Sequence, residues 1–166
     1  MEAEALVGRP DPLVRTVDRT ASLEDVFRRE YDAMFRLAHL ITGSPEAAED
    51  VVQESFVRLC RNWDRAAQPG AYLRTVVVSR CRSWQRRRIL ERQPRPHPPS
   101  PSVDNDAREL FDALARLGVR QRAALVLRFY ADMSEADVAQ VLGCRPGTVK
   151  SLVHRGLRTL EGSIER

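Results

Sequence analysis

The sequence predicts an all-α protein made of two small helical domains joined by a proline-rich linker. Apolar residues recur at steps of three and four along several stretches, and residues suited to helix ends flank many of them. No segment shows the sustained apolar–polar alternation of a strand. Residues 93–104 contain five prolines, which favour an extended chain. We therefore expect a flexible extension over residues 1–20, a first domain over 21–92, a linker over 93–104 and a second domain over 105–166.

Two helices are expected at the start of the first domain. Ser22 and Asp25 form a capping-box pattern, and the apolar stripe that follows ends at Gly43, which suits a helix C-terminus. Ser44 and Pro45 mark the start of the second helix. The residues expected to point inward are Val26, Phe27, Tyr31, Met34, Phe35, Leu37, Ala38, Ile41, Ala48, Val51, Val52, Phe56 and Leu59. The opposite stripe of the second helix carries Asp50, Gln53, Glu54 and Arg58, and we expect it to be exposed.

A third helix is expected over residues 71–90, after a loop that contains Trp63, Pro69 and Gly70. The candidates for its buried side are Tyr72, Leu73, Val76, Val77, Cys81 and Trp84.

The C-terminal half of this third helix is unusually basic. Residues 61–95 hold 10 basic and 2 acidic residues, whereas residues 1–60 hold 7 basic and 12 acidic ones. Arginines late in a helix complement its dipole, but six of them around an aromatic residue exceed that need. These six are Arg74, Arg80, Arg82, Arg86, Arg87 and Arg88. Such clusters attract phosphate backbones, and arginine together with Trp84 suits single-stranded or distorted nucleic acid, although Trp84 alone is more typical of a core.

The second domain is expected to begin with helices over residues 107–117 and 120–130. Their inward residues are predicted to be Leu110, Phe111, Leu114, Leu117, Ala124, Leu125, Leu127 and either Phe129 or Tyr130. Residues 133–160 then predict a helix-turn-helix, since Ser134 and Asp137 form a second capping-box pattern and a short turn lies between Gly143 and Pro146. The inward stripe of its second helix is Val149, Leu152 or Val153, Leu157 and Leu160.

The other face of that last helix is polar and basic. It carries Thr148, Lys150, Ser151, His154, Arg155 and Arg158. Hydroxyl and cationic groups in the first turns of such a helix are what the DNA major groove accepts. DNA binding is therefore our leading hypothesis for this domain, and a solvated basic face is the alternative.

Composition excludes several classes of protein. The net charge is +4, no apolar run reaches the length of a membrane span, and no signal stretch opens the chain, so we expect a cytoplasmic protein without membrane insertion. Three scattered cysteines suggest neither disulfides nor a metal site, and no cofactor is expected. His39, His97 and His154 are dispersed and no acidic cluster adjoins the basic block, so the chain is not expected to be an enzyme.

The chain resembles a bacterial RNA polymerase sigma factor of the sigma-70 superfamily, extracytoplasmic-function (ECF) type. The resemblance runs from about Leu23 to Ile164, and the matching stretches are YDAMFRLAHLITGSPEAAEDVVQESFVRL at 31–59, AYLRTVVVSRCRSWQRRR at 71–88 and LRFYADMSEADVAQVLGCRPGTVKSLVHRGLRTL at 127–160. It implies a fold of sigma region 2 and sigma region 4. It also implies core RNA polymerase and promoter DNA as partners, and it suggests an anti-sigma factor.

The resemblance assigns roles to particular residues. Asp50, Gln53 and Glu54 fit the family's D-x-x-Q-E pattern, which docks on the β′ clamp helices of the polymerase. The third helix and the preceding loop, residues 65–72, would open the −10 promoter element, with Arg80, Trp84, Arg86, Arg87 and Arg88 on the DNA. The helix-turn-helix would read the −35 element through Arg145, Thr148, Lys150, Ser151, His154 and Arg155.

The alternative function is a stand-alone helix-turn-helix transcriptional regulator. It explains the second domain, but it leaves the acidic stripe and the arginine-rich helix of the first domain without a role.

Overall fold

The computed structural model describes residues 22–91 and 105–164, which form helices and no strand. The elements are α1 (Leu23–Thr42), α2 (Pro45–Arg61), η1 (Trp63–Arg65), α3 (Pro69–Leu90), α4 (Asn105–Ala115), α5 (Val119–Leu125), η2 (Val126–Tyr130), α6 (Glu135–Leu142) and α7 (Pro146–Ile164). The predicted all-α class is confirmed. The predictions for residues 1–20 and 93–104 lie outside the described residues.

The ends of α1 and α2 form as their sequences predict. The Asp25 backbone N–H donates to the Ser22 hydroxyl at 3.2 Å, and the Ser22 N–H donates to the Asp25 carboxylate at 2.9 Å, which completes the capping box. These hydrogen bonds hold the pKa of Asp25 below its usual value. Gly43 ends α1 with φ 75°, a left-handed conformation that glycine adopts without strain. Ser44 caps α2, with Pro45 in its first turn.

The bundle of α1, α2 and α3 buries most of the predicted stripe. Phe27 is an exception, because it lies at the bundle edge, where it remains exposed and packs on Tyr31 and Phe56. Helix α3 begins at Pro69, two residues before the prediction, since proline is well suited to the first turn of a helix. Val78 is fully buried, although the sequence pattern did not predict it as an inward residue.

The predicted helix over residues 120–130 changes geometry halfway. After α5, residues 126–130 form a π-helical turn, in which the Ala131 N–H donates to the Val126 carbonyl five residues earlier. The wider turn shifts the following side chains around the axis, so Phe129 and Tyr130 are both exposed. The expectation that one of them points inward was wrong. Leu110 on α4 is also exposed, contrary to prediction.

Helices α6 and α7 form the predicted helix-turn-helix. The Ser134 hydroxyl accepts the Asp137 N–H at 3.1 Å, but the Asp137 carboxylate accepts from that hydroxyl and not from the Ser134 backbone, so the capping box is half formed. Gly143 ends α6 with φ 62°.

The buried side of α7 differs from its predicted stripe. Val149 and Leu152 are buried, and Leu157 is exposed, contrary to prediction. Gly156 takes the inward position, because a Cβ there would lie 2.7 Å from the Leu125 Cδ1 atom. The close approach of α7 to α5 therefore depends on a glycine, which a pattern of apolar residues cannot indicate.

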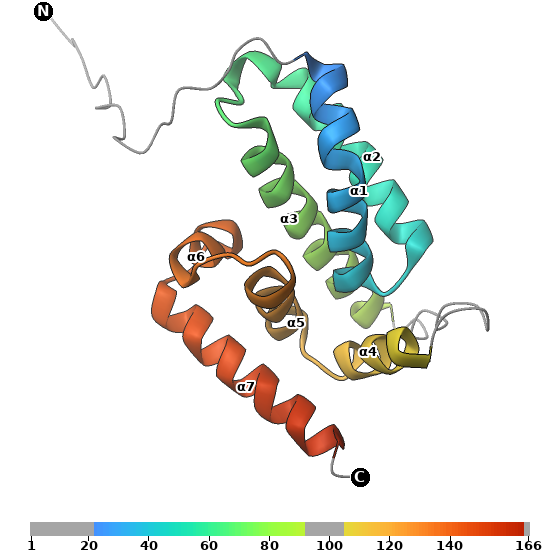
Figure 1. Cartoon of the computed structure of the whole chain (residues 1–166), viewed down its shortest axis with the longest axis vertical. Helices are drawn as coiled ribbons and strands as arrows, with labels where there is room; N and C mark the ends of the chain where they lie inside the picture. Colours follow the sequence, from blue (N-terminus) through green and yellow to red (C-terminus); the bar gives the residue numbers. More distant parts are fainter. Residues whose placement is uncertain (1–21, 92–104, 165–166) are drawn as a thin grey trace, which may run out of the picture.

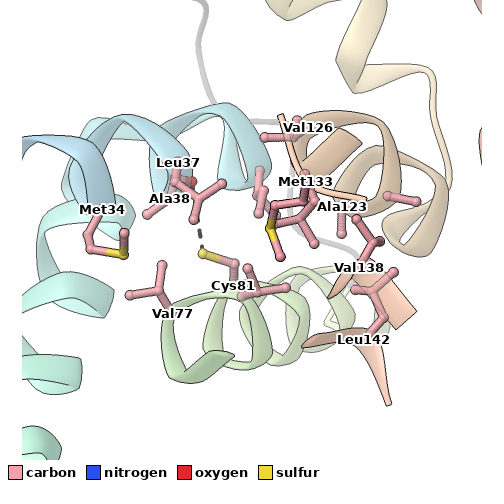
Figure 2. Close-up of a cluster of buried hydrophobic side chains, with 14 of the residues drawn as sticks. Met34, Leu37, Ala38, Val77, Cys81, Ala123, Val126, Met133, Val138 and Leu142 are labelled. Atoms are coloured by element: carbon pink, nitrogen blue, oxygen red, sulfur yellow. Dashed lines mark hydrogen bonds between the residues drawn. The ribbon is translucent and has the colours of Figure 1, made fainter. Parts of the chain in front are cut away.

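The two groups of helices pack on each other. Helices α5 and α6 lie against α3, and α1 contacts α4, α5 and η2 (Figure 1). Buried side chains of both groups form one continuous cluster, to which the first group contributes Ala38 and Cys81 and the second contributes Met133 and Val138 (Figure 2). The structure thus brings the arginine-rich helix and the helix-turn-helix into one body.

Candidate nucleic-acid and protein interfaces

The exposed stripe of α2 forms the first candidate surface, the docking stripe, defined as Asp50, Gln53 and Glu54. All three side chains are exposed, because Val51, Val52 and Ser55 turn the opposite side of the helix into the bundle. The Gln53 amide donates to the Glu49 carboxylate at 3.2 Å. The stripe offers carboxylates and an amide, groups that pair with arginine and backbone donors of a partner.

One side of α3 forms the second candidate surface, the arginine face, defined as Arg80, Trp84, Arg87 and Arg88. These residues follow one another at helical spacing, and the Arg88 guanidinium lies over the Trp84 ring, 4.7 Å from its centroid. Arg80 forms an ion pair with Glu54 of the docking stripe. Burial lowers the pKa of Arg80 and of Arg88, but both guanidinium groups stay charged near neutral pH.

Arg86 lies apart from the arginine face. Its guanidinium donates to the Ser83 hydroxyl at 3.3 Å. Burial, and then the positive charges of Arg120 and Arg86, lower the pKa of Arg82. The five predicted −10 residues therefore occupy two sides of α3.

The start of α7 presents the third candidate surface. Arg145, Lys150, Ser151, His154 and Arg155 are exposed, and Thr148 is half-buried. The Ser151 hydroxyl donates to the Gly147 carbonyl at 3.0 Å, and Arg155 Nε donates to the Ser151 carbonyl at 3.2 Å. The Ser151 oxygen keeps its acceptor capacity and the Arg155 guanidinium keeps its remaining donors, so both can still contact a base or a phosphate.

Two arginines outside the predicted sites join the two groups of helices. Arg82 on α3 donates to the Leu142 carbonyl at the end of α6, at 3.2 Å, and Arg122 on α5 donates to the Leu40 carbonyl near the end of α1, at 2.7 Å. Carbonyls in the last turn of a helix lack helical partners and carry the negative end of its dipole, which makes them good acceptors for guanidinium groups.

Arg122 is buried, with 5% of its surface exposed. Burial lowers its pKa to about 10, so it remains charged at neutral pH. Its guanidinium lies against Gly43, where a Cβ would come within 3.2 Å of it. The sequence holds one signal for this role, a cation at a position of α5 whose neighbours Ala123 to Leu127 are all apolar.

His39 lies in the same interface. Its ring packs on Phe111 of α4 at 4.5 Å between centroids and on Phe35 at 6.0 Å, and its Nε2 atom is buried without a hydrogen bond. Burial, and then the nearby positive charge of Arg122, lower the pKa of His39, while Glu46 acts in the opposite direction.

We expect stability to fall as the pH drops below about 6.5, because the unfolded chain then binds a proton that folded His39 resists. A His39→Gln variant should show a flatter dependence of melting temperature on pH between about 5 and 7. Circular dichroism melts of both proteins measure this, with His154→Gln at an exposed position as the control. Parallel curves for the parent and His39→Gln would contradict the assignment.

The described ranges contain neither a helix that could span a membrane nor a cluster of potential metal ligands. Over residues 22–91 and 105–164, no helix has the length and apolarity to cross a bilayer. Within the same ranges, no three His, Cys, Asp or Glu side chains gather as metal ligands.

A small helical bundle with an acidic stripe and an arginine face, packed against a helix-turn-helix, defines a class of DNA-binding transcription protein. Family models agree in detail: residues 26–89 match Sigma-70 region 2 and residues 107–160 match Sigma-70, region 4. The chain belongs to the sigma-70 family of RNA polymerase sigma factors and is of the ECF type.

Individual relatives support this membership. The chain is 36% identical over 151 residues to an RNA polymerase sigma-E factor of Streptomyces avermitilis, covering 86% of this chain and 84% of the relative. It is 30% identical to the ECF RNA polymerase sigma factor SigL of Mycobacterium tuberculosis, covering 92% and 97%. A solved complex of the sigma factor RpoE with the anti-sigma factor NepR from Bartonella quintana has a similar fold, with a TM-score of 0.72, 24% identity and coverage of 86% and 96%.

Membership decides between the two functions considered from the sequence. A stand-alone regulator is not favoured, since the region 2 match spans the bundle that such a protein would not need. The chain is a sigma factor, and its family is one of transcription initiation proteins rather than of catalysts.

Proposed function

We propose that the docking stripe binds core RNA polymerase, with Asp50, Gln53 and Glu54 against the β′ clamp helices. The support is their common exposure on α2, whose other side is fixed in the bundle. Charged and amide groups on a rigid helix favour a polar contact with arginines of a partner helix. The second group of helices would contact the β subunit.

The arginine face and Arg86 then hold the opened −10 element. Arg80, Arg86, Arg87 and Arg88 contact phosphates, and Trp84 offers a ring to an unstacked base once Arg88 moves from it. The segment over residues 65–72, which precedes and begins α3, would receive a flipped base. The −35 element is read as duplex by the start of α7, through Arg145, Thr148, Lys150, Ser151, His154 and Arg155.

Binding of both elements at once requires the two groups of helices to separate. The −35 and −10 elements lie about 25 base pairs apart, which corresponds to about 85 Å along B-form DNA. Helices α3 and α7 have 22 and 19 residues, which correspond to about 33 Å and about 28 Å, and both pack on α5. The contacts of Arg82 and Arg122 would therefore break in the transcribing complex.

The protein acts in the cytoplasm, where polymerase works, and it performs no catalysis of its own. An anti-sigma factor would regulate the protein, which is supported by a structural neighbour that is a sigma factor solved with one. Such a partner would cover surfaces that polymerase needs.

The observation that carries this proposal is the presence of an acidic stripe and an arginine face on adjoining helices of one bundle. The test is transcription in vitro from a pool of GC-rich genomic fragments, using core polymerase from a high-GC bacterium with and without this protein. We expect start sites that appear only with the protein and share two motifs at fixed spacing. The absence of new start sites, with footprints by the protein alone on duplex DNA, would refute the proposal.

Variants then separate the surfaces. Asp50→Ala with Gln53→Ala should weaken binding to core polymerase in a pull-down, because both groups belong to the docking stripe. Lys150→Ala with Ser151→Ala should leave that binding intact and reduce initiation at promoters that depend on the −35 element, by roughly 1–3 kcal/mol for a base contact. Equal defects of both pairs in the pull-down would contradict this division.

A further inference from the structure

Glu54 lies where the docking stripe meets the arginine face. Its carboxylate on α2 forms an ion pair with the Arg80 guanidinium on α3. The Glu54 side chain is 54% exposed, whereas the Arg80 side chain is 22% exposed. The pair thus links a residue assigned to polymerase with the first residue of the face assigned to DNA.

The Arg80 guanidinium lies in an unfavourable environment apart from this pair. Burial and then the positive charge of Arg87 lower its pKa, and its Nε atom is buried without a hydrogen bond. A partly desolvated cation needs a nearby negative charge to stay in place. Glu54 supplies that charge across the contact between α2 and α3.

Helical spacing places Arg80 at the beginning of the arginine face. Trp84 follows one turn later and Arg87 two turns later. Without Glu54, repulsion by Arg87 would favour other rotamers of Arg80, and holding the guanidinium against a phosphate would then cost side-chain entropy. A guanidinium already fixed by a carboxylate avoids most of that cost.

We propose that Glu54 is a positioning residue for promoter DNA, which acts through Arg80 and holds its guanidinium at the start of the arginine face. This inference rests on the proposed function and deepens it, because it gives Glu54 a second role that Asp50 and Gln53 lack. Direct contact between Glu54 and polymerase would not depend on Arg80, so a double-mutant cycle distinguishes the two roles.

The cycle uses holoenzyme containing the full chain and the strongest promoter found in the transcription test. Glu54→Gln, Arg80→Gln and the double variant are compared for formation of open complexes and for affinity to core polymerase. Each single change should reduce open complexes by roughly three- to tenfold, as expected for a partly exposed pair next to the DNA. With core polymerase saturated by the protein, the double variant should form open complexes to the same extent as Arg80→Gln alone. Any loss of core affinity caused by Glu54→Gln should be the same whether or not Arg80 is present, because that contact does not involve Arg80. Glu54→Asp, which keeps the charge, should retain more activity than Glu54→Gln.

Controls make each outcome decisive. Asp50→Asn belongs to the docking stripe alone, so its loss of core affinity should multiply with the effect of Arg80→Gln. Arg80→Met, which preserves the apolar stem, repeats the cycle in a background that keeps the packing. The inference is overturned if Glu54→Gln has no effect, or if it costs as much in both Arg80 backgrounds as in the parent. Failure of the parent protein to initiate would instead refute the proposed function.

Discussion

Replacing Arg122 with glutamate is expected to lower the free energy of unfolding by about 3–5 kcal/mol, the range for a buried charge left without its partner. The parent guanidinium donates to the Leu40 carbonyl and lies beside Gly43, at the negative end of the α1 dipole. A carboxylate there would face the Leu40 carbonyl oxygen in a site that is 5% exposed. Urea unfolding followed by circular dichroism measures the loss.

Two other variants show whether charge or volume is responsible. Arg122→Met keeps most of the volume and removes the buried charge, so it should cost much less than Arg122→Glu. Arg108→Glu makes the same charge change at an exposed position of α4 and should alter stability by less than about 0.5 kcal/mol. Equal losses for Arg108→Glu and Arg122→Glu would show that net charge, and not the α1–α5 contact, determines the result.

Features set by neighbouring residues could be predicted from the sequence. Ser22, Gly43, Ser44 and Gly143 end or begin helices where expected, because caps and left-handed turns depend on local backbone geometry. The stripe of α2 was also correct on both sides, since the helical period alone determines which residues face the bundle.

Features set by tertiary contacts could not be predicted from the sequence. The π-helical turn at Val126–Tyr130 keeps a helical composition, so the exposure of Phe129 and Tyr130 has no local signal. Gly156 is inward because α5 approaches it, and apolar patterns overlook glycine. Arg82 belongs to the arginine cluster that the sequence associates with nucleic acid, and only the position of α6 gives its guanidinium a carbonyl acceptor.

The functions assigned to the candidate sites depend more on the family than on the helical pattern of polar residues. Exposure of Asp50, Gln53, Lys150 and Ser151 follows from periodicity, but an exposed polar face is equally typical of any soluble helix. The family membership gives those faces their expected partners. The link between Glu54 and Arg80 required the structure, since it joins two helices whose relative positions the sequence does not encode in any short motif.

Replacing Arg86, Arg87 and Arg88 together with alanine is expected to weaken binding of the opened −10 strand by about 100-fold. Each charge-assisted contact to a phosphate contributes about 1 kcal/mol, so the three contacts together contribute about 3 kcal/mol. Arg86 and Arg87 are exposed, and Arg88 lies on Trp84, so their removal leaves the buried side of α3 unchanged. The affinity should also become less dependent on salt, with the slope of log K against log salt smaller by about 2, because fewer counterions are released.

Fluorescence anisotropy of the holoenzyme with a labelled single strand from the identified promoter measures both quantities over a salt series. The matched control replaces three exposed arginines away from α3, Arg36, Arg108 and Arg116, with alanine and so makes the same change in net charge. A similar loss in that control would mean that overall charge attracts the strand. Loss confined to the α3 variant, with the smaller salt slope, would place the phosphate contacts on the end of α3, because only local cations displace counterions from the bound segment.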